Sequence, residues 1–217
     1  MAEKKVILPY TPTREYEVES VGELPRKPVY ELVKRCLDVI LSAFLLLLLA
    51  IPMIVIGLAV KLTSPGPALY TQERLGKDGK QIKICKFRTM VFDSEIDTIR
   101  WSYDEDPRVT PLGRVLRKYH IDELPQLWDI FRGVLSFVGP RPERAVFYDA
   151  FETYIHGFRE RLKVKPGLTG LAQVTGGGLM PPEEKIVCDI EYIRNRSVVL
   201  DLKLIVKTLV VVLLGRF

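Results

Sequence analysis

Two adjacent carboxylates, Asp122 and Glu123, are the residues of this chain best suited to chemistry. A carboxylate can act as a nucleophile or bind a divalent cation. Asp122 stands where a helix N-cap is expected, and Pro125 falls in the first turn, where a missing N–H matters little. The apolar face and the end of this predicted helix are formed by Leu124, Leu127, Trp128, Phe131 and Gly133. The Asp122–Glu123 dyad would then lie at a positive helix end, which favours anions.

Arg141 is the next candidate, because it stands between Pro140 and Pro142. Two prolines restrict the backbone, so the guanidinium could be aimed at a phosphate with little loss of freedom. Carboxylates and a fixed arginine near a helix N-terminus are typical of phosphate and metal chemistry. Taken alone, these residues also allow a purely structural explanation. Asp122 could only cap a helix, and Arg141 could be a surface arginine in a rigid turn.

The composition limits the kind of protein. The 217 residues correspond to one domain with attachments, and the net charge of +5 favours an anionic partner such as a phosphate, a nucleotide or an anionic membrane surface. The basic residues are interleaved with carboxylates, which argues against a nucleic-acid partner. Three widely spaced cysteines predict neither a disulfide framework nor a zinc site, and two histidines disfavour a histidine-based metal site.

The most apolar segment runs from Val39 to Val60, 22 residues without a charge. Its length is that of a membrane helix, but Pro52 predicts a break near its middle. The part before the proline covers about 20 Å as a helix, less than a hydrocarbon layer of roughly 30 Å. Two structures stay open: a kinked spanning helix, or a re-entrant hairpin with both ends on the cytoplasmic side, where basic residues flank it. A buried helix of a soluble protein is disfavoured by length.

The remaining segments predict an α/β fold that is mostly helical with a small β-hairpin. The expected strands are residues 68–72 and 81–87, and the expected helices are 93–101, 112–119, 143–162, 182–195 and 200–214. The predicted organisation is an N-terminal extension (1–30), a membrane hairpin (31–62), a catalytic domain (63–197) and an amphipathic interfacial helix (198–217). The extension lacks the apolar core of a secretory signal and could be a partner-binding arm.

A set of motifs follows a specific order. They are Lys34-Arg35-x-x-Asp38, Gly66-Pro67, Gln72-x-Arg74-x-Gly76, Lys86-Phe87-Arg88-Thr89-Met90, Asp122-Glu123-Leu124-Pro125-Gln126-Leu127, Val138-Gly139-Pro140-Arg141-Pro142 and Lys165-Pro166-Gly167-Leu168-Thr169-Gly170. Together they closely resemble the bacterial sugar transferases, the monotopic phosphoglycosyl transferases. The likeness covers about residues 30 to 210. Each motif is weak alone, whereas the ordered set is highly specific.

The resemblance implies a reaction and a location. Such enzymes transfer a sugar 1-phosphate from a nucleoside diphosphate sugar, usually a UDP-sugar, to polyprenyl phosphate, and they use Mg²⁺. This is the first membrane step of surface glycan biosynthesis. The apolar segment would be a re-entrant hairpin that contacts membrane lipids at the cytoplasmic face of a bacterial inner membrane. The oligomeric state stays open, and a homodimer is one alternative.

Roles for individual residues also follow from the resemblance. Asp122 would be the nucleophile of a ping-pong cycle, and Glu123 would bind Mg²⁺ beside it, directly or through water. The donor phosphates and nucleotide would be bound by Lys86, Arg88, Arg117 and Arg141. The membrane-side residues would be Lys34, Arg35, Asp38 and Pro52. Of these, the two basic residues would anchor the hairpin at lipid headgroups or bind the polyprenyl phosphate, the aspartate would pair with an interfacial cation, and the proline would make the break.

One segment departs from the family pattern. Many members carry a Gly-Arg pair soon after Ala-Gln-Val, whereas Ala172-Gln173-Val174-Thr175 is followed here by Gly176-Gly177-Gly178. The glycines could form a flexible loop or an anion nest, and nucleotide or sugar contacts of this loop do not carry over.

Two rival hypotheses remain. In one, Asp122 is a base in a ternary complex; in the other, the chain is a non-enzymatic membrane module that recruits glycan-assembly partners.

Overall fold

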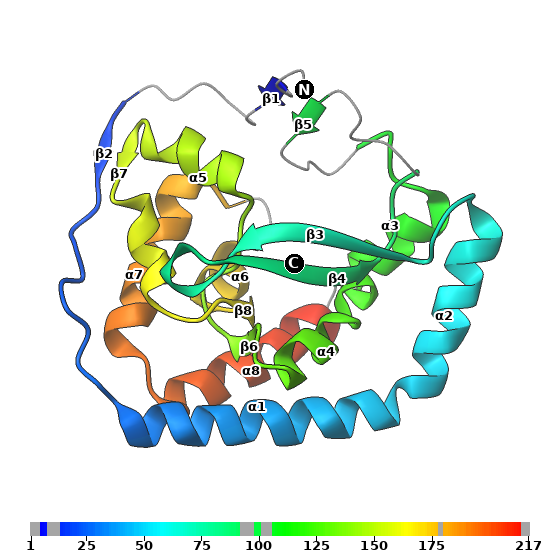
Figure 1. Cartoon of the computed structure of the whole chain (residues 1–217), viewed down its shortest axis with the longest axis horizontal. Coiled ribbons are helices and arrows are strands. Elements are labelled where there is room, and N and C mark those ends of the chain that lie inside the picture. Colours follow the sequence, from blue (N-terminus) through cyan, green and yellow to red (C-terminus); the bar gives the residue numbers. More distant parts are fainter. Residues whose placement is uncertain (1–4, 8–13, 92–97, 101–105, 178–179, 214–217) are drawn as a thin grey trace.

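Short helices and small sheets surround a β-hairpin in the computed structural model, which describes residues 5–7, 14–91, 98–100, 106–177 and 180–213 (Figure 1). The strands are β1 (Lys5–Ile7), β2 (Tyr16–Glu17), β3 (Leu69–Leu75), β4 (Gln81–Phe87), β5 (Thr98–Arg100), β6 (Ser136–Val138), β7 (Ile155–His156) and β8 (Gly167–Thr169). The α-helices are α1 (Pro28–Leu48), α2 (Ala50–Thr63), α3 (Pro111–Lys118), α4 (Gln126–Phe131), α5 (Ala145–Glu152), α6 (Leu171–Gly176), α7 (Pro182–Asn195) and α8 (Val198–Leu213). The 3₁₀ turns are η1 (Lys77–Gly79), η2 (Ile121–Glu123) and η3 (Phe158–Lys163). This mixture confirms the predicted fold class.

Every sheet in the described part of the chain has two strands. β3 and β4 are antiparallel, with Leu69 opposite Phe87 and Leu75 opposite Gln81, which confirms the predicted hairpin. β6 and β8 are parallel, and β1 pairs in parallel with β5. β2 pairs in parallel with β7, so this part of the N-terminal extension lies against the domain.

Pro52 breaks the apolar helix, as predicted. α1 ends at Leu48, α2 begins at Ala50, and the two helices are bent by 64°. The reason is that Pro52 has no N–H for the carbonyl of Leu48 and its ring clashes with that carbonyl. Within the described residues no single helix is long and apolar enough to cross a membrane, whereas α1 and α2 meet that test as a bent pair.

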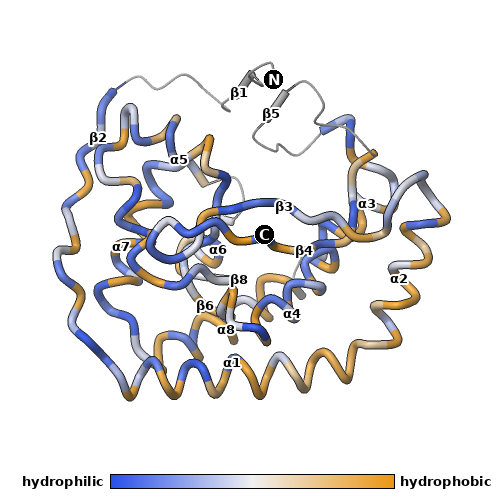
Figure 2. The backbone as a smooth tube through the Cα atoms, in the orientation of Figure 1, coloured by the Kyte–Doolittle hydropathy of each residue, from blue (hydrophilic) through white to orange (hydrophobic). Residues whose placement is uncertain are grey.

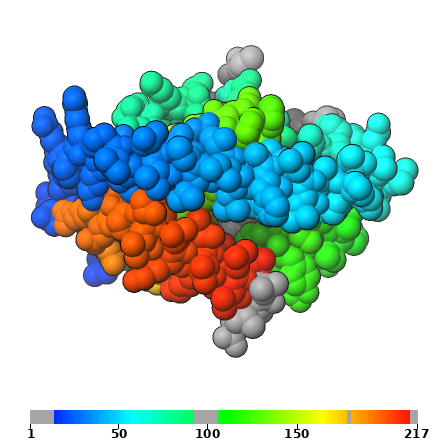
Figure 3. Space-filling model, turned by 90° about the horizontal axis from the view of Figure 1, so that it is seen from below, coloured from blue at the N-terminus to red at the C-terminus, as the bar shows by residue number. Residues whose placement is uncertain are grey.

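An apolar surface covers one face of the molecule. α1 starts at Pro28, before the expected hairpin boundary at residue 31, and its exposed stripe is apolar from Val29 onward. Figure 2 shows the apolar run continuing through α2, and Figure 3 shows α1, α2 and α8 together on this face. The largest exposed apolar side chains of these helices are Val29, Leu32, Leu37, Ile40, Phe44, Leu47, Leu48, Ile51, Ile54, Val55, Leu58, Leu62, Val199, Leu202, Val206, Leu209 and Val210. We call this set the apolar face.

The predicted helices have mixed outcomes. Those at 112–119, 182–195 and 200–214 are confirmed by α3, α7 and α8. The helix predicted at 143–162 is wrong in its second half, because Gly157 at φ 93° turns the chain after α5 and β7. The helix predicted at 93–101 is wrong for residues 98–100, which form β5, and its other residues lie outside the described ones.

Two apolar clusters fix the elements around the dyad. The larger one contains a group of packed aromatic rings: Phe147, Tyr148, Phe151, Tyr154 and Phe158. The smaller one is built on Val60, Phe87 and Leu116, which come from α2, β4 and α3. This small cluster seats the second half of the broken helix directly against the elements that flank residues 120–124.

Candidate active site

The dyad lies in a 3₁₀ turn and not at a helix N-cap. His120 has a left-handed backbone (φ 52°), and the N–H of Glu123 donates to its carbonyl at 3.1 Å. α4 starts later, with Pro125 in the capping position, so the prediction that Asp122 caps the helix is wrong. Pro125 has no N–H, and the bonds that lead into α4 run from the N–H of Leu127 to the Leu124 carbonyl at 3.0 Å and from the N–H of Trp128 to the Pro125 carbonyl at 3.1 Å. Gly133 (φ 82°) follows the end of α4, as predicted.

Glu123 is held by two cations. Its Oε1 lies 2.5 Å from Lys86 Nζ and 2.5 Å from Arg141 Nη2, and its Oε2 lies 3.3 Å from Arg141 Nη1. Burial alone would raise the pKa of Glu123, but the charges of Arg141 and Lys86 hold that pKa well below its usual range. The same carboxylate raises the pKa of Arg141. Glu123 therefore stays ionised and joins β4 to the loop after β6.

Asp122 is buried but unpaired. Asp122 is 7% exposed, and its carboxylate forms no hydrogen bond or ion pair among the described residues. Burial and the neighbouring Glu123 charge raise the pKa of Asp122 to about 6, against the opposing charges of Lys86, Arg117 and Arg141. A desolvated carboxylate with no donor to satisfy it is well suited to attack an electrophile.

Arg117 reaches the dyad from α3. Its Nε donates to Thr89 Oγ1 at 2.8 Å, which orients the guanidinium. Burial lowers the pKa of Arg117, and the charge of Asp122 is the largest influence that raises it. Lys86, Arg117 and Arg141 therefore lie around the dyad, and their role in binding phosphate stays a prediction. Thr89 was not predicted as a site residue, although it belongs to the motif that contains Lys86.

Arg88 is engaged elsewhere. Its two Nη atoms donate to the backbone carbonyls of Pro65 and Ser64, the latter at 2.8 Å. These carbonyls follow the C-terminus of α2, so Arg88 fixes the exit from the broken helix. The phosphate-binding role of Arg88 stays a prediction, and the contacts of its guanidinium are those of a structural residue.

The loop that carries Arg141 is locked against a second loop. The N–H of Gly139 donates to the Thr169 carbonyl at 2.8 Å, and the N–H of Gly167 donates to the Pro140 carbonyl at 3.0 Å. A Cβ on Gly139 would lie 2.4 Å from the Lys165 carbonyl oxygen, so only glycine allows this approach. The two motifs therefore act as one unit.

A buried ionic network supports the same loop. Arg161 Nη2 donates to the Arg141 carbonyl at 2.9 Å and pairs with Asp189 at 2.6 Å. Beside it, Glu143 pairs with Arg74 at 2.9 Å and with Lys185 at 3.4 Å. Sequence analysis did not predict these residues. The available signals were the position of Glu143 directly after the Arg141 motif and of Arg74 inside a motif of its own.

Lys34 is not a headgroup anchor. Its Nζ donates to the Val138 carbonyl at 2.9 Å and pairs with Asp201 at 2.7 Å, while Tyr192 OH lies 3.4 Å away. The ammonium therefore joins α1 to β6 and α8 inside the protein. The anchoring role was predicted because the sequence does not show that α1 packs on the domain before the uncharged run begins at Val39. The other predicted role of Lys34, binding of polyprenyl phosphate, stays a prediction.

Arg35 and Asp38 bind the end of α4 and the start of β6, the two elements that follow the dyad in the chain, and we call this pair the α1 clamp. Arg35 donates to the carbonyls of Ile130 and Phe131, at 2.8 and 2.7 Å, and so caps the C-terminus of α4. Asp38 accepts from the N–H of Phe137 at 3.0 Å and from Ser136 Oγ at 3.1 Å, at the start of β6. The predicted roles, an anchor and an interfacial ion pair, are replaced by contacts to backbone.

The α1 clamp should contribute measurably to stability. Asp38→Ala leaves two buried donors without an acceptor, so we expect unfolding to require about 2 kcal/mol less free energy, seen as a melting temperature several degrees lower. Asp38→Asn keeps an acceptor oxygen and should recover most of this loss. Glu31→Ala, on an exposed residue of the same helix, is the control and should leave the melting temperature unchanged. Equal melting of Asp38→Ala and wild type would contradict the clamp.

One carboxylate of the dyad, and not both, is suited to bind Mg²⁺. Mg²⁺ is usually bound by one or two carboxylates with substrate phosphates and water. Asp122 fits this role because its carboxylate is unpaired, whereas both oxygens of Glu123 already face cations. In the part of the chain that the structure describes, no three His, Cys, Asp or Glu side chains converge as a metal site.

The glycine run after α6 has a packing reason in its described part. A Cβ on Gly176 would lie 2.3 Å from the terminal methyl of Met180, and Gly177 adopts φ 70°. Gly178 lies outside the described residues. The glycines therefore fit a tight exit from α6, and the anion nest stays a prediction.

Comparison with known proteins matches the chain to one family. Residues 29–215 match the family described as bacterial sugar transferase. UDP-glucose:undecaprenyl-phosphate glucose-1-phosphate transferase of Escherichia coli (strain K12) is 39% identical, over 88% of this chain and 44% of its own length. UDP-N-acetylgalactosamine-undecaprenyl-phosphate N-acetylgalactosaminephosphotransferase of Aeromonas hydrophila is 37% identical, over 90% and 47%. A UDP-glucose:undecaprenyl-phosphate glucose-1-phosphate transferase of Caulobacter vibrioides is 43% identical, over 86% and 72%. The chain thus spans about half the length of the first two relatives.

Proposed function

Because the chain belongs to the bacterial sugar transferase family, we propose that it transfers a sugar 1-phosphate from a UDP-sugar to undecaprenyl phosphate. The products are undecaprenyl diphosphate sugar and UMP. The relatives named above carry this type of reaction in their names, with different sugars. The single observation that supports the proposal most is the buried, unpaired carboxylate of Asp122 among the charges of Lys86, Arg117 and Arg141.

The proposed reaction has two steps. In the first, an Asp122 Oδ atom attacks the phosphorus that bears the sugar, the bond from that phosphorus to the UMP oxygen breaks, and UMP leaves. This forms an acyl phosphate on Asp122. In the second, an oxygen of undecaprenyl phosphate attacks the same phosphorus, the bond to Asp122 breaks, and the carboxylate is regenerated. No proton has to be moved in either displacement.

The cations of the site supply the charge balance for these steps. Attack of one anion on another requires positive charge at the phosphates. Arg141 and Lys86 share the carboxylate of Glu123, which orients both side chains. Mg²⁺, when bound through Asp122 and the donor phosphates, would neutralise further negative charge.

We propose that the apolar face seats the chain on the membrane as a re-entrant, monotopic protein. α1 and α2 form a bent pair, and α1, α2 and α8 lie together on one face of the molecule (Figure 3). All three helices carry large exposed apolar side chains. Such a face would bring the acceptor lipid to the dyad from the membrane, with the donor arriving from the cytoplasm. Tags placed at the two termini should both be accessible from the cytoplasmic side, and a periplasmic tag would contradict this topology.

A donor screen tests the proposed reaction. The purified chain in vesicles with undecaprenyl phosphate is given single UDP-sugars and Mg²⁺, and released UMP is measured together with labelled lipid product. We expect UMP release that depends on the acceptor and matches the lipid product. Absence of lipid product with every UDP-sugar, for a correctly folded chain, would contradict the proposal and favour a membrane module without activity.

Glu123→Gln separates two roles of the second carboxylate. If Glu123 acts by orienting Lys86 and Arg141, the variant should lose about 10- to 100-fold in kcat, while the Mg²⁺ concentration for half-maximal activity stays unchanged. Glu184→Gln, on an exposed glutamate of α7, is the matched control. A Mg²⁺ requirement that rises in proportion to the loss would instead make Glu123 a metal ligand.

A further inference from the structure

A strip of polar side chains leads away from the dyad along one face of the hairpin. The register places Tyr70 directly opposite Lys86, and residues opposite each other share a face of the sheet. Gln72 and Arg74 follow on the same face of β3 because side chains alternate along a strand. The strip therefore begins at the lysine that holds Glu123.

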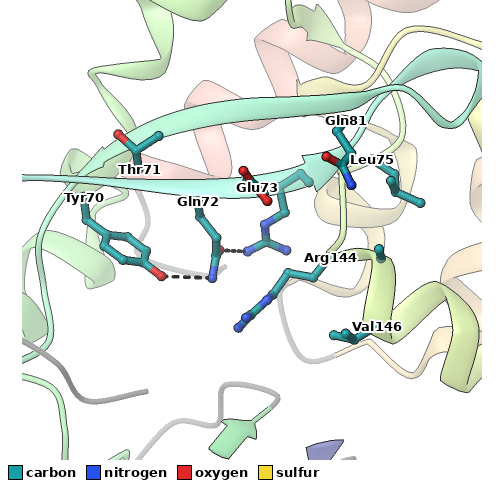
Figure 4. Close-up of a pocket in the computed structure, with 10 residues that line it drawn as sticks. Tyr70, Thr71, Gln72, Glu73, Leu75, Gln81, Arg144 and Val146 are labelled. Carbon is teal, nitrogen blue, oxygen red and sulfur yellow. Dashed lines mark hydrogen bonds between the residues drawn. The ribbon is translucent and has the colours of Figure 1, made fainter. Parts of the chain in front are cut away.

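The strip is ordered by its own hydrogen bonds. Gln72 donates from Nε2 to Tyr70 OH at 3.3 Å and accepts from Arg74 Nη2 at 2.5 Å (Figure 4). Arg74 is fixed in turn by Glu143 at 2.9 Å and by the Pro142 carbonyl at 3.3 Å. Its Nε is buried and has no hydrogen-bond partner among the described residues. None of these contacts has a part in the two proposed displacements.

A cavity of about 290 Å³ opens beside this strip, and we call it the hairpin cavity. Its other wall is the start of α5, where Arg144 extends beneath Gln72 in the close-up (Figure 4). The charged side chains that line the cavity are Arg74, Arg144 and Glu73. Because Glu143 already pairs with Arg74, the guanidinium of Arg144 is the cation of this wall that could meet an anionic ligand. α5 lies on the opposite side of the hairpin from α1, away from the apolar face (Figure 1).

The geometry points to the hairpin cavity as the binding site for the nucleoside monophosphate half of the donor, an inference that rests on the proposed function. Arg141 and Arg144 are three residues apart, which spans at most about 10 Å, so a nucleotide whose phosphate meets Arg141 could reach the cavity with its base. The Tyr70 ring offers a stacking surface, the amides of Gln72 and Gln81 offer polar contacts, and Arg144 offers a guanidinium. UMP, the leaving group, would therefore lie on the side away from the lipid.

Binding of UMP to the purified full-length chain tests this inference directly. Arg144→Ala and Tyr70→Ala should each weaken UMP binding by about tenfold or more in calorimetry, and Tyr70→Phe should retain it because the ring remains. In transfer assays the same variants should raise the KM for the UDP-sugar and leave the KM for undecaprenyl phosphate unchanged. Lys80→Ala, on an exposed cation at the turn of the same hairpin that does not line the cavity, is the control and should change neither quantity.

The outcomes distinguish this inference from the proposed function. Unchanged UMP affinity in both Arg144→Ala and Tyr70→Ala would overturn the inference, even if transfer is intact. The inference would also be overturned if these variants changed the preference among UDP-sugars without changing UMP binding, because the cavity would then hold the sugar. Loss of UMP binding in the variants supports the inference even where no donor in the screen reacts.

Discussion

Asp122→Asn should lower the transfer rate at least about 10³-fold and, at the same time, make the protein more stable at pH 8. The asparagine keeps the size of the side chain but cannot form the acyl phosphate. Incubation of wild type with a UDP-sugar alone should add the mass of one phosphosugar to the chain, located on Asp122, and the variant should add none. Asp149→Asn, on an exposed aspartate of α5, is the matched control and should form the adduct.

The stability gain follows from the raised pKa. The pKa of Asp122 rises from 3.8 to about 6 on folding, because burial and the Glu123 charge disfavour its ionised form. The folded state binds this proton more tightly, so the stabilisation is complete below pH 4 and is lost as the pH rises through 6. This difference in pKa between the folded and unfolded states corresponds to about 3 kcal/mol in the free energy of unfolding. In EDTA, Asp122→Asn should therefore melt several degrees above wild type at pH 8 and with a much smaller difference at pH 4.5.

Four results would count against this account. A phosphosugar adduct on the Asp122→Asn variant would exclude Asp122 as the nucleophile. An inactive Asp122→Asn, together with a wild type that forms no adduct, would favour the ternary complex in which Asp122 is a base. Full turnover by Asp122→Asn would remove the residue from the mechanism altogether. Equal melting of the two proteins at pH 8 would contradict the desolvated state of the carboxylate.

Arg141→Ala should reduce kcat/KM for the donor by about 10²- to 10³-fold and destabilise the fold by about 3 kcal/mol. The first effect is loss of a fixed charge at the phosphates. The second arises because Glu123 remains buried with Lys86 as its single remaining ion-pair partner among the described residues. Arg141→Lys should restore most of the stability, but less of the activity, because a lysine cannot replace the bidentate fork.

A double variant separates the two effects. Glu123→Gln combined with Arg141→Ala should be less destabilised than the sum of the single changes, because the unpaired buried charge is removed. Melting temperatures and donor kinetics are measured on the same preparations. Arg159→Ala serves as control, since this arginine forms an exposed ion pair with Asp149. An unchanged kcat/KM for folded Arg141→Ala would contradict a role for Arg141 at the donor phosphates.

The sequence predicted local features of the fold well where one physical cause dominates. Pro52 breaks the apolar helix because a proline removes a specific hydrogen bond, and Asn195 ends α7 as expected. The helix predicted through Gly157 is wrong because the apolar spacing continues across a glycine that turns the chain. Asp122 was misplaced as an N-cap because the pattern of a capping residue before a proline also fits a 3₁₀ turn.

The site was predicted as a set of residues but not as a structure. Lys86, Arg117 and Arg141 do surround the dyad, which motif order could suggest. That Glu123 joins Lys86 and Arg141 depends on contacts 37 and 18 residues apart in the sequence, and no local pattern encodes them. The internal contacts of the basic pair in α1 were not predicted for the same reason, since Lys34 pairs with Asp201, which lies 167 residues away in the sequence.

The α1 clamp has a consequence for the order in which the chain assembles. Arg35 and Asp38 are synthesised before their partners in α4 and β6, which emerge 95 to 99 residues later. The clamp contacts of α1 therefore cannot form until the dyad and the segment up to the Arg141 loop have been translated. Contacts so distant in sequence close slowly, because loop closure must precede any gain from the contact. In the membrane topology proposed above, the bilayer would hold this helix in the meantime and shorten the search, so it would act as a folding template.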